Sequence, residues 1–317
     1  MLTVLMATRN GEDTLQVTLD AFTRLASPAG GWKLLLVDNG STDRTPQIAA
    51  AFDRRLPLTY LWEGGVGKNV ALNAGLSHAE GDLIVFTDDD VVPRMDWLVR
   101  LREAADNHPA FSMFGGAIVA RWEQPPPGWL RWLDHGHLFS VTNPQLREGP
   151  VQPETIFGPN MAVRAGVFDA GARFDTSIGP RGSSYAMGSE TELVQRLGWQ
   201  GLRAWHAEHA VVEHIVRGYQ MSRAWVAGRA VRFGRGMYRL QRLEQSGTPL
   251  LPWTTLMMLK CARRVLRIGR ARLTGDERAL CTARWELNYF RGLMMEAGLR
   301  SRERHVAPAG FAKKAIG

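Results

Sequence analysis

Short apolar runs alternate with amphipathic segments through the first 90 residues of the 317-residue chain. Runs of four to six mostly apolar residues predict buried strands, at Leu2–Ala7, Lys33–Val37, Leu58–Leu61 and Leu83–Thr87. The intervening segments predict helices, at Leu15–Leu25, Arg44–Arg54 and Val66–Ala79. Because strands and helices alternate, right-handed crossovers are expected, and these build a mainly parallel α/β sheet covered by helices on both faces.

The polar residues of this region gather where the expected strands end. Thr8 and Asn10 follow the first strand, Asp38 closes the second, and Asp88–Asp90 follows the fourth. The carboxyl ends of parallel strands meet at one edge of a sheet, and ligands of such sheets bind there. The sequence therefore predicts a polar site at this edge.

After residue 90 the pattern becomes less regular. Pro93 is expected to open a helix that runs to Asn107, and Met113–Ala120 predicts another strand. Residues 122–150 are rich in tryptophan and proline and are interpreted as a long connection packed over the site. A further helix is expected near Glu190–Leu197, and the chain from Tyr219 onward is interpreted as helical and basic.

The net charge of +8 conceals a division of the chain. Residues 1–220 hold 19 Lys and Arg against 25 Asp and Glu, whereas residues 221–317 hold 20 against 6. The basic character therefore belongs to the tail. This division argues against a nucleic-acid-binding protein and favours a catalytic front part with a basic module attached.

The sequence carries no signal for export or membrane insertion. No apolar run approaches the roughly 18 residues of a membrane-spanning helix, and the N-terminus lacks the basic region of a secretory signal. Cys261 and Cys281 do not frame a disulfide-stapled fold. A cytoplasmic protein is therefore expected.

The aspartates at the sheet edge suggest a divalent cation. Adjacent carboxylates repel one another unless a cation compensates them, and Mg²⁺ and Mn²⁺ prefer oxygen ligands and bridge to phosphates. Asp88–Asp90 is either such a site or a solvated turn, and the nearby Asp38 favours the first reading. Asp38 is suited to accept a hydrogen bond from a uracil-type base. The segment Gly64–Asn69 matches neither a P-loop nor a dinucleotide fingerprint, but Lys68 suits a diphosphate as a point charge.

Several motifs in the same order then identify a resemblance. The chain reads TRN, VDNGSTD, GKNVALNAGL, GDLIVFTDDD and, further on, GPNMAVRAGVFDAGARFD and GSETELVQRLGWQGLRAWHAEHAVVEH. This series resembles glycosyltransferase family 2, whose members are inverting nucleotide-sugar transferases with the GT-A fold. The resemblance covers about residues 1–235. It implies a Rossmann-like nucleotide-binding domain, here followed by a basic helical extension.

The resemblance also implies roles for individual residues. Nucleotide-binding positions match Thr8, Asn10, Asp38, Lys68, Asn69, Asp88 and Asp89, with Lys68 or Asn69 at the diphosphate. The metal-binding DxD motif matches Asp88 and Asp90, with Asp90 as the direct ligand of Mn²⁺ or Mg²⁺ and Asp88 nearer the ribose or a metal-bound water. His214 falls where many GT-A enzymes supply a further metal ligand. The alternative is a structural histidine at a strand end, with its hydrogen bonds satisfied within the protein.

The general base is less clearly marked. Family members commonly show Glu-Asp-x-Asp/Glu-Leu, whereas this chain has Ser189-Glu190-Thr191-Glu192-Leu193. On a helix Glu190 and Glu192 point about 200° apart, so only one of them faces the sugar. Glu190 is the preferred base, and Glu192 is its structural partner or substitute. The alternative is that Glu190 and Glu192 are only charged residues in the first turn of a helix and have no catalytic role.

The expected domains are a GT-A domain at 1–240 and a basic helical region at 241–317. Residues 1–121 form the nucleotide-sugar half and residues 122–240 the acceptor half. Within the basic region, residues 253–273 place apolar side chains on one side and cations mostly elsewhere. Such a segment lies on an anionic membrane surface or packs on the catalytic domain, and the sequence leaves both readings open.

Together these features predict a metal-dependent inverting glycosyltransferase. Its donor is a nucleotide sugar, with UDP as the commonest nucleotide of the family. Its acceptor is a glycan or lipid-linked hydroxyl in surface polysaccharide or glycolipid synthesis, reached from the cytoplasm or the inner face of the membrane. One alternative is a sugar nucleotidyltransferase, which the single glycine of ATRNGEDT disfavours. The other is a degenerate nucleotide-sugar-binding protein, which Ser189 favours.

Overall fold

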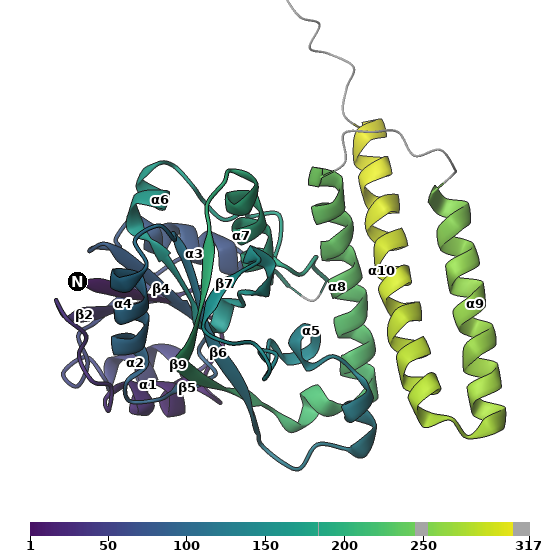
Figure 1. Cartoon of the computed structure of the whole chain (residues 1–317), viewed down its shortest axis with the longest axis horizontal. Helices are drawn as coiled ribbons and strands as arrows, with labels where there is room; N and C mark the ends of the chain where they lie inside the picture. The colour runs from purple at the N-terminus through teal and green to yellow at the C-terminus, as the bar shows by residue number, and fades with distance from the viewer. Residues whose placement is uncertain (183, 245–252, 307–317) are drawn as a thin grey trace, which may run out of the picture. The chain divides into compact units, whose positions relative to one another are not determined.

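The computed structural model describes residues 1–182, 184–244 and 253–306 (Figure 1). The chain divides after Val226 into two compact units, which are described separately. Parts of the expected basic region, residues 245–252 and 307–317, lie outside the described residues.

The first unit begins with the expected alternation of strands and helices. Its elements are β1 (Leu2–Thr8), α1 (Leu15–Phe22), β2 (Trp32–Asp38), α2 (Thr45–Ala50), β3 (Leu58–Trp62), α3 (Lys68–Leu76) and β4 (Leu83–Thr87). The strands lie in the order β3-β2-β1-β4 and every neighbouring pair is parallel. The carboxyl ends of these strands therefore share one edge, as the sequence predicts.

The sheet continues with antiparallel as well as parallel pairs. The next elements are β5 (Val91–Pro93), α4 (Trp97–Asn107), β6 (Met113–Trp122), α5 (His135–Phe139), β7 (Gly149–Val151), β8 (Met161–Arg164), α6 (Ala165–Asp169), α7 (Ser189–Trp199) and β9 (Ala204–Val216). The strand order after β4 is β8-β6-β9-β5, and β7 lies beside β9. Residues 122–150 are thus a connection that contains short elements of its own.

The prediction that a helix starts at Pro93 is wrong. Val91–Pro93 is a strand paired antiparallel with Val212–His214, and α4 starts only at Trp97. A proline suits the first turn of a helix, but it is also tolerated at the edge of a sheet. The partner residues Val212–His214 lie far along the chain from Val91–Pro93, so no local pattern indicates this pairing.

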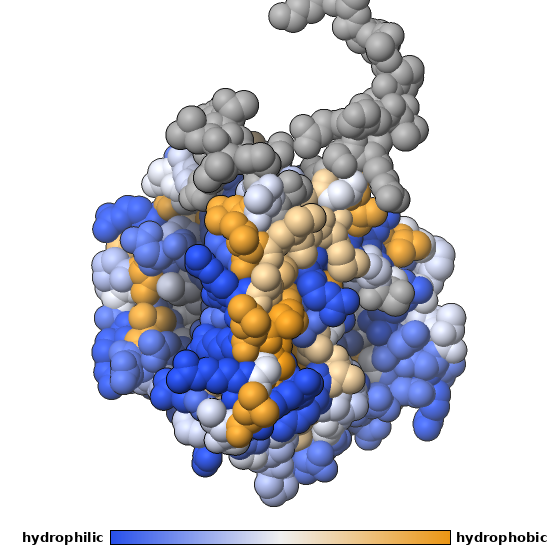
Figure 2. All heavy atoms as spheres, turned by 90° about the vertical axis from the view of Figure 1, so that its right-hand side faces the viewer, coloured by the Kyte–Doolittle hydropathy of each residue, from blue (hydrophilic) through white to orange (hydrophobic). Residues whose placement is uncertain are grey.

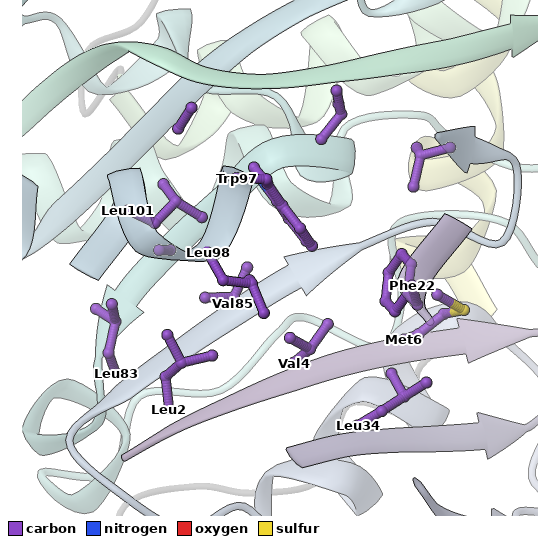
Figure 3. Packing of buried hydrophobic residues seen from close by; sticks show 14 of the residues in the cluster. Leu2, Val4, Met6, Phe22, Leu34, Leu83, Val85, Trp97, Leu98 and Leu101 are labelled. Atoms are coloured by element: carbon purple, nitrogen blue, oxygen red, sulfur yellow. The ribbon is translucent and has the colours of Figure 1, made fainter. Parts of the chain in front are cut away.

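The core consists of one apolar layer on each face of the sheet. Figure 3 shows Leu2, Val4 and Met6 of β1 on one face, packed with Phe22 of α1 and Trp97 of α4. Alternate residues of the same strand, such as Leu5, enter the other layer with side chains of α3 and α7. Because both faces of the sheet are covered, a ligand of this sheet is expected at the carboxyl ends of its strands.

The second unit is built from the helices α8 (Arg223–Glu244), α9 (Trp253–Thr274) and α10 (Glu277–Val306). α8 and α10 approach closely at Gly234 and Gly292, where a β-carbon would lie 2.1 Å from a backbone oxygen of the other helix. Glu296 is buried there and accepts from Arg235 at 2.9 Å and Arg239 at 2.6 Å. Within the described ranges, none of the helices combines the length and the apolar character needed to cross a membrane.

Asn160 ties the two halves of the sheet together. Its amide nitrogen donates to the carbonyls of Ala117 (2.9 Å) and Ala210 (2.8 Å), beside the register shift between β6 and β9. Its oxygen accepts from the buried Trp97 indole at 2.8 Å. A buried polar group that loses its partner costs about 1–3 kcal/mol, so this side chain is expected to be a major contributor to stability.

We expect Asn160→Ala to lower the free energy of unfolding by about 2–4 kcal/mol, because one donor and two carbonyls lose their partner. Urea unfolding followed by circular dichroism measures the change. Asn107→Ala, at the exposed end of α4, is the matched control and should change stability by less than about 0.5 kcal/mol. Equal effects of the two substitutions would contradict this role.

Candidate active site at the carboxyl edge of the sheet

Asp38 is a buried carboxylate held by its neighbours at the end of β2. One oxygen accepts from the backbone N–H of Ser41 at 2.7 Å, and the other accepts from the Tyr60 hydroxyl at 2.7 Å. Burial, together with the adjacent Asp38 carboxylate, raises the pKa of Tyr60. The side chain of Asp38 is therefore fixed in direction. The sequence interpretation missed Tyr60, whose position in β3 opposite β2 was the available signal.

The loops beside Asp38 are cross-linked by side-chain amides. Asn10, at a positive φ of 53°, accepts from the backbone N–H of Thr42 at 2.9 Å. Asn39 donates to the carbonyl of Glu63 at 3.2 Å and accepts from the N–H of Gly67 at 3.0 Å. Asn39 was not identified from the sequence as a residue of the site. These contacts give the rim of the site a defined shape.

Lys68 joins two carboxylates that are far apart in the sequence. Its ammonium group lies 2.6 Å from Oδ1 of Asp88 and 2.7 Å from Oε1 of Glu190. Burial opposes the charge of Lys68, but the two carboxylates outweigh it and raise its pKa. The side chains of all three residues are about a fifth exposed, so the cluster is accessible from the edge.

Asn69, the other candidate for the diphosphate, lies in a different environment. Its side chain is buried, and its amide nitrogen donates to the carbonyls of Asp175 (2.7 Å) and Ile178 (3.0 Å). Asn69 therefore holds the segment that follows β8 and α6, while Lys68 faces the cluster.

The three aspartates after β4 point to three different partners. Asp88 pairs with Lys68, Asp89 accepts from the Thr8 hydroxyl, and Asp90 lies 3.2 Å from Nε2 of His214. Burial and the neighbouring Asp90 charge raise the pKa of Asp89 to about 7. Burial also opposes the charge of Asp90, but His214 outweighs it and lowers the pKa of that carboxyl.

His214 is oriented by the backbone of α5. Its Nδ1 lies 2.6 Å from the carbonyl oxygen of Phe139, and because a carbonyl only accepts, Nδ1 carries a hydrogen. Nε2 is thereby directed at Asp90. A backbone carbonyl that fixes the second nitrogen in this way is typical of metal-binding histidines. Burial disfavours protonation of His214, yet the Asp90 carboxylate raises its pKa above the usual value.

Asp88, Asp90 and His214 form a donor set that suits a divalent ion. One ligand atom from each lies within 4.8 Å of the others. Two carboxylates and an imidazole match the preferences of Mn²⁺, and the carboxylates also match Mg²⁺. The residues present therefore fit the ion that the aspartate triplet suggests.

Glu190 and Glu192 lie in different environments, as their helical spacing predicts. Glu190 reaches Lys68, and a β-carbon on Gly158 would lie 2.5 Å from its carboxyl group. Glu192 is buried and pairs with Arg196 at 2.7 Å, one turn along α7. Gly158 thus leaves room for the Glu190 carboxyl group, whereas Glu192 pairs within its own helix.

Aromatic side chains of the long connection lie next to the candidate metal ligands. The Trp122 ring lies 5.6 Å from that of His135 and 5.4 Å from that of Phe139, and the Phe139 ring stacks on Trp225 at 5.8 Å. The Phe139 backbone is the one that orients His214. The connection therefore takes part in building the site.

Arg217 is a cation at the site that the sequence interpretation passed over. It follows β9 three residues after His214, and its charge contributes to the lowered pKa of Asp90. It also lies 3.4 Å from Asp13 in the segment after β1. In the sequence, the only indication that Arg217 lies at the site was its position three residues after His214.

Comparison with known proteins agrees with the motifs. The model of the family described as Glycosyl transferase family 2 matches residues 3–168. The chain is 26% identical over 211 residues to the succinoglycan biosynthesis protein ExoM of Rhizobium meliloti (strain 1021). That match covers 66% of this chain and 64% of ExoM, so the chain spans less than two thirds of the length of this relative.

Solved structures show the same fold. The mannosyltransferase PcManGT from Pyrobaculum calidifontis, in complex with GDP-Man and Mn²⁺, superposes with a TM-score of 0.57 at 18% identity, over 96% of this chain and 80% of that one. S. aureus TarS 1-349, in complex with UDP-GlcNAc, has a TM-score of 0.53 at 16% identity, over 95% and 92%. The expected GT-A fold with a helical C-terminal region is therefore confirmed.

The raised pKa of Asp89 gives stability a pH dependence. Between about pH 4 and pH 7 the folded state holds this proton more tightly than the unfolded state, so the contribution of Asp89 to stability falls as pH rises. Asparagine stays neutral at every pH, so its free energy of unfolding does not fall in this way. We therefore expect the free energy of unfolding of Asp89→Asn, relative to that of the native chain, to increase by about 1–3 kcal/mol from pH 5 to pH 8. Urea unfolding at both pH values measures this. The exposed Asp53→Asn is the control, and a parallel response of the two variants would contradict the assignment.

Proposed function

Because the chain belongs to glycosyl transferase family 2, we propose that it transfers a sugar from a nucleoside-diphosphate donor to a hydroxyl group of a glycan or lipid-linked acceptor, with inversion at the anomeric carbon. The observation that carries this proposal is the position of Lys68, within 2.7 Å of both Asp88 and Glu190. One cation thus joins the aspartate motif for the donor to the candidate base for the acceptor.

The donor is proposed to bind along the ends of β1, β2 and β4. Thr8, Asn10 and Asp38 line the nucleoside side, where Asp38 is fixed by Ser41 and Tyr60. Because Asp38 is suited to accept a hydrogen bond from a uracil-type base, a UDP-sugar is the first donor to test. A GDP-sugar is the second. The TarS structure holds UDP-GlcNAc and the PcManGT structure holds GDP-Man. Lys68 is the proposed contact to the diphosphate.

Asp90, Asp88 and His214 are the proposed ligands of Mn²⁺ or Mg²⁺. Such an ion, when bound, supplies a Lewis acid that offsets the negative charge of the departing diphosphate. The chain prepares for it by holding the donor atoms within 4.8 Å of one another and by fixing Nδ1 of His214 on the Phe139 carbonyl. The lowered pKa of Asp90 keeps that carboxylate ionised.

Glu190 is the proposed general base. The acceptor hydroxyl oxygen bonds to the anomeric carbon, its proton passes to the Glu190 carboxylate, and the bond from that carbon to the diphosphate oxygen breaks. Lys68 holds the Glu190 carboxyl group in place at 2.7 Å, and a positioned general base is worth about 10²–10⁴-fold in rate. Displacement from the opposite side accounts for inversion.

Ser189, which replaces the usual acidic residue, is a buried residue at the start of α7. The residue is buried, and a β-carbon on Gly179 would lie 2.0 Å from its hydroxyl oxygen. We assign the proposed chemistry to the next residue, Glu190, which reaches Lys68, and this argues against a degenerate site. Family membership likewise favours glycosyl transfer over nucleotidyl transfer. We assign residues 1–240 to this reaction, with 1–121 for the donor and 122–240 for the acceptor, and residues 241–317 to a separate basic region.

We expect Glu190→Gln to lower kcat by at least about 10²-fold with little change in the donor KM, because the amide does not accept the proton. Glu192→Gln is the matched control on the same helix and should retain kcat within a few-fold in the folded fraction. The measurement is release of nucleoside diphosphate with each acceptor class. Loss of turnover in Glu192→Gln with normal turnover in Glu190→Gln would reverse the assignment.

Donor and ion binding are tested without turnover. In the presence of Mn²⁺, the cognate UDP- or GDP-sugar at about 100 times its Kd should stabilise the native chain by about 2.7 kcal/mol, or several degrees in Tm. Asp90→Ala should remove most of this shift, whereas Asp53→Ala on the exposed surface should retain it. A shift that is independent of both Mn²⁺ and Asp90 would refute the metal site.

A further inference from the structure

The helix α9 carries an exposed apolar stripe. Met258, Leu259, Val265, Leu266 and Leu273 are exposed to 65%, 56%, 55%, 74% and 90%. Successive residues of a helix are about 100° apart, which places these five within one sector, together with the small residues Ala262 and Gly269. Figure 2 shows a band of hydrophobic side chains bordered by hydrophilic ones on this face. An exposed band of this kind indicates an interaction surface.

This stripe is distinct from the face with which α9 packs in its own unit. Met257 is buried in a cluster with Tyr238 and Phe290, and Ala271 is also buried. On the same side Arg264 pairs with Glu286 of α10 at 2.9 Å. The internal packing of the helical unit is therefore satisfied without the stripe.

The charged residues at the borders of the stripe are all cations. α9 contains Lys260 and five arginines and no acidic residue. At the helical spacing, Arg263, Arg267 and Arg270 follow one border and Arg272 the other. Arg263, Arg270 and Arg272 make no ion pair with any side chain in the part of the chain that the structure describes, and Arg267 lies 3.7 Å from Glu286. The exposed face of α9 thus presents unneutralised positive charge around an apolar centre.

We propose that this face of α9 docks on an anionic lipid bilayer. The apolar side chains enter the boundary between headgroups and acyl chains, while the arginines extend their charged ends to the lipid phosphates. A second copy of the chain fits less well, because pairing two such faces would bring arginines against arginines with no carboxylate between them. Charge complementarity therefore selects an anionic surface with an apolar interior.

The proposal goes beyond glycosyl transfer and does not depend on it. Binding to vesicles is measured without donor or acceptor, so a failure of the proposed reaction leaves this test intact. If both hold, the surface places the enzyme where lipid-linked hydroxyl groups are concentrated.

The test is co-sedimentation of the full chain with vesicles of phosphatidylcholine, with or without phosphatidylglycerol. Binding is expected to the anionic vesicles and to weaken with added salt. Leu266→Ser with Leu273→Ser should weaken it by at least about tenfold, because two apolar side chains no longer enter the bilayer. Arg263→Gln with Arg270→Gln should weaken it by about 10–30-fold, at about 1 kcal/mol for each charge.

Val17→Ser and Arg54→Gln, both on the exposed surface of the first unit, are the matched controls and should bind like the native chain. Circular dichroism confirms that each variant is folded. Equal binding to neutral vesicles, or equal weakening by the controls, would overturn the proposal. So would a dimer in light scattering that Leu266→Ser with Leu273→Ser dissociates, since the stripe would then be covered by a second copy.

Discussion

The arrangement of the site depends on the electrostatics of four carboxylates held together at the edge of a closed sheet. Asp88, Asp89, Asp90 and Glu190 lie at low exposure, where like charges repel strongly. The chain offsets them with Lys68 between Asp88 and Glu190 and with His214 beside Asp90. Asp89 is relieved by partial protonation, as its pKa of about 7 indicates. The remaining negative charge favours a divalent cation, which in turn would attract the anionic diphosphate.

The part of the sheet with antiparallel as well as parallel pairs, β8-β6-β9-β5, brings His214 to these carboxylates. Antiparallel pairing of β5 with β9 sets Val91 opposite His214 and brings the N–H of Ile215 within 2.8 Å of the Asp90 carbonyl. The backbones of Asp90 and His214 are therefore held side by side by strand pairing. Gly158 acts in a similar way for Glu190, because any β-carbon there would occupy the space of its carboxyl group.

The two units differ in the charge of the surfaces proposed to bind ligands. The first unit holds the acidic edge and a core covered on both faces of the sheet, and the donor is proposed to bind at the strand ends. The helical unit has a satisfied internal packing around Glu296 and still exposes an apolar stripe bordered by arginines. The proposed catalytic centre is acidic and the proposed membrane-binding surface is cationic, and the two belong to different units of the chain.

The sequence by itself determined the parallel half of the sheet and its polar edge, because strand and helix periods and strand-end residues such as Asp38 and Asp88 are local signals. It also determined that Glu190 and Glu192 face different ways, which follows from helical geometry alone. Only the tertiary structure decided that Val91–Pro93 is a strand, that Tyr60 and Arg217 join the site, that Lys68 bridges Asp88 and Glu190, and which face of α9 remains exposed. These features arise from contacts between segments far apart in the chain, and a single sequence records each partner without recording that they meet.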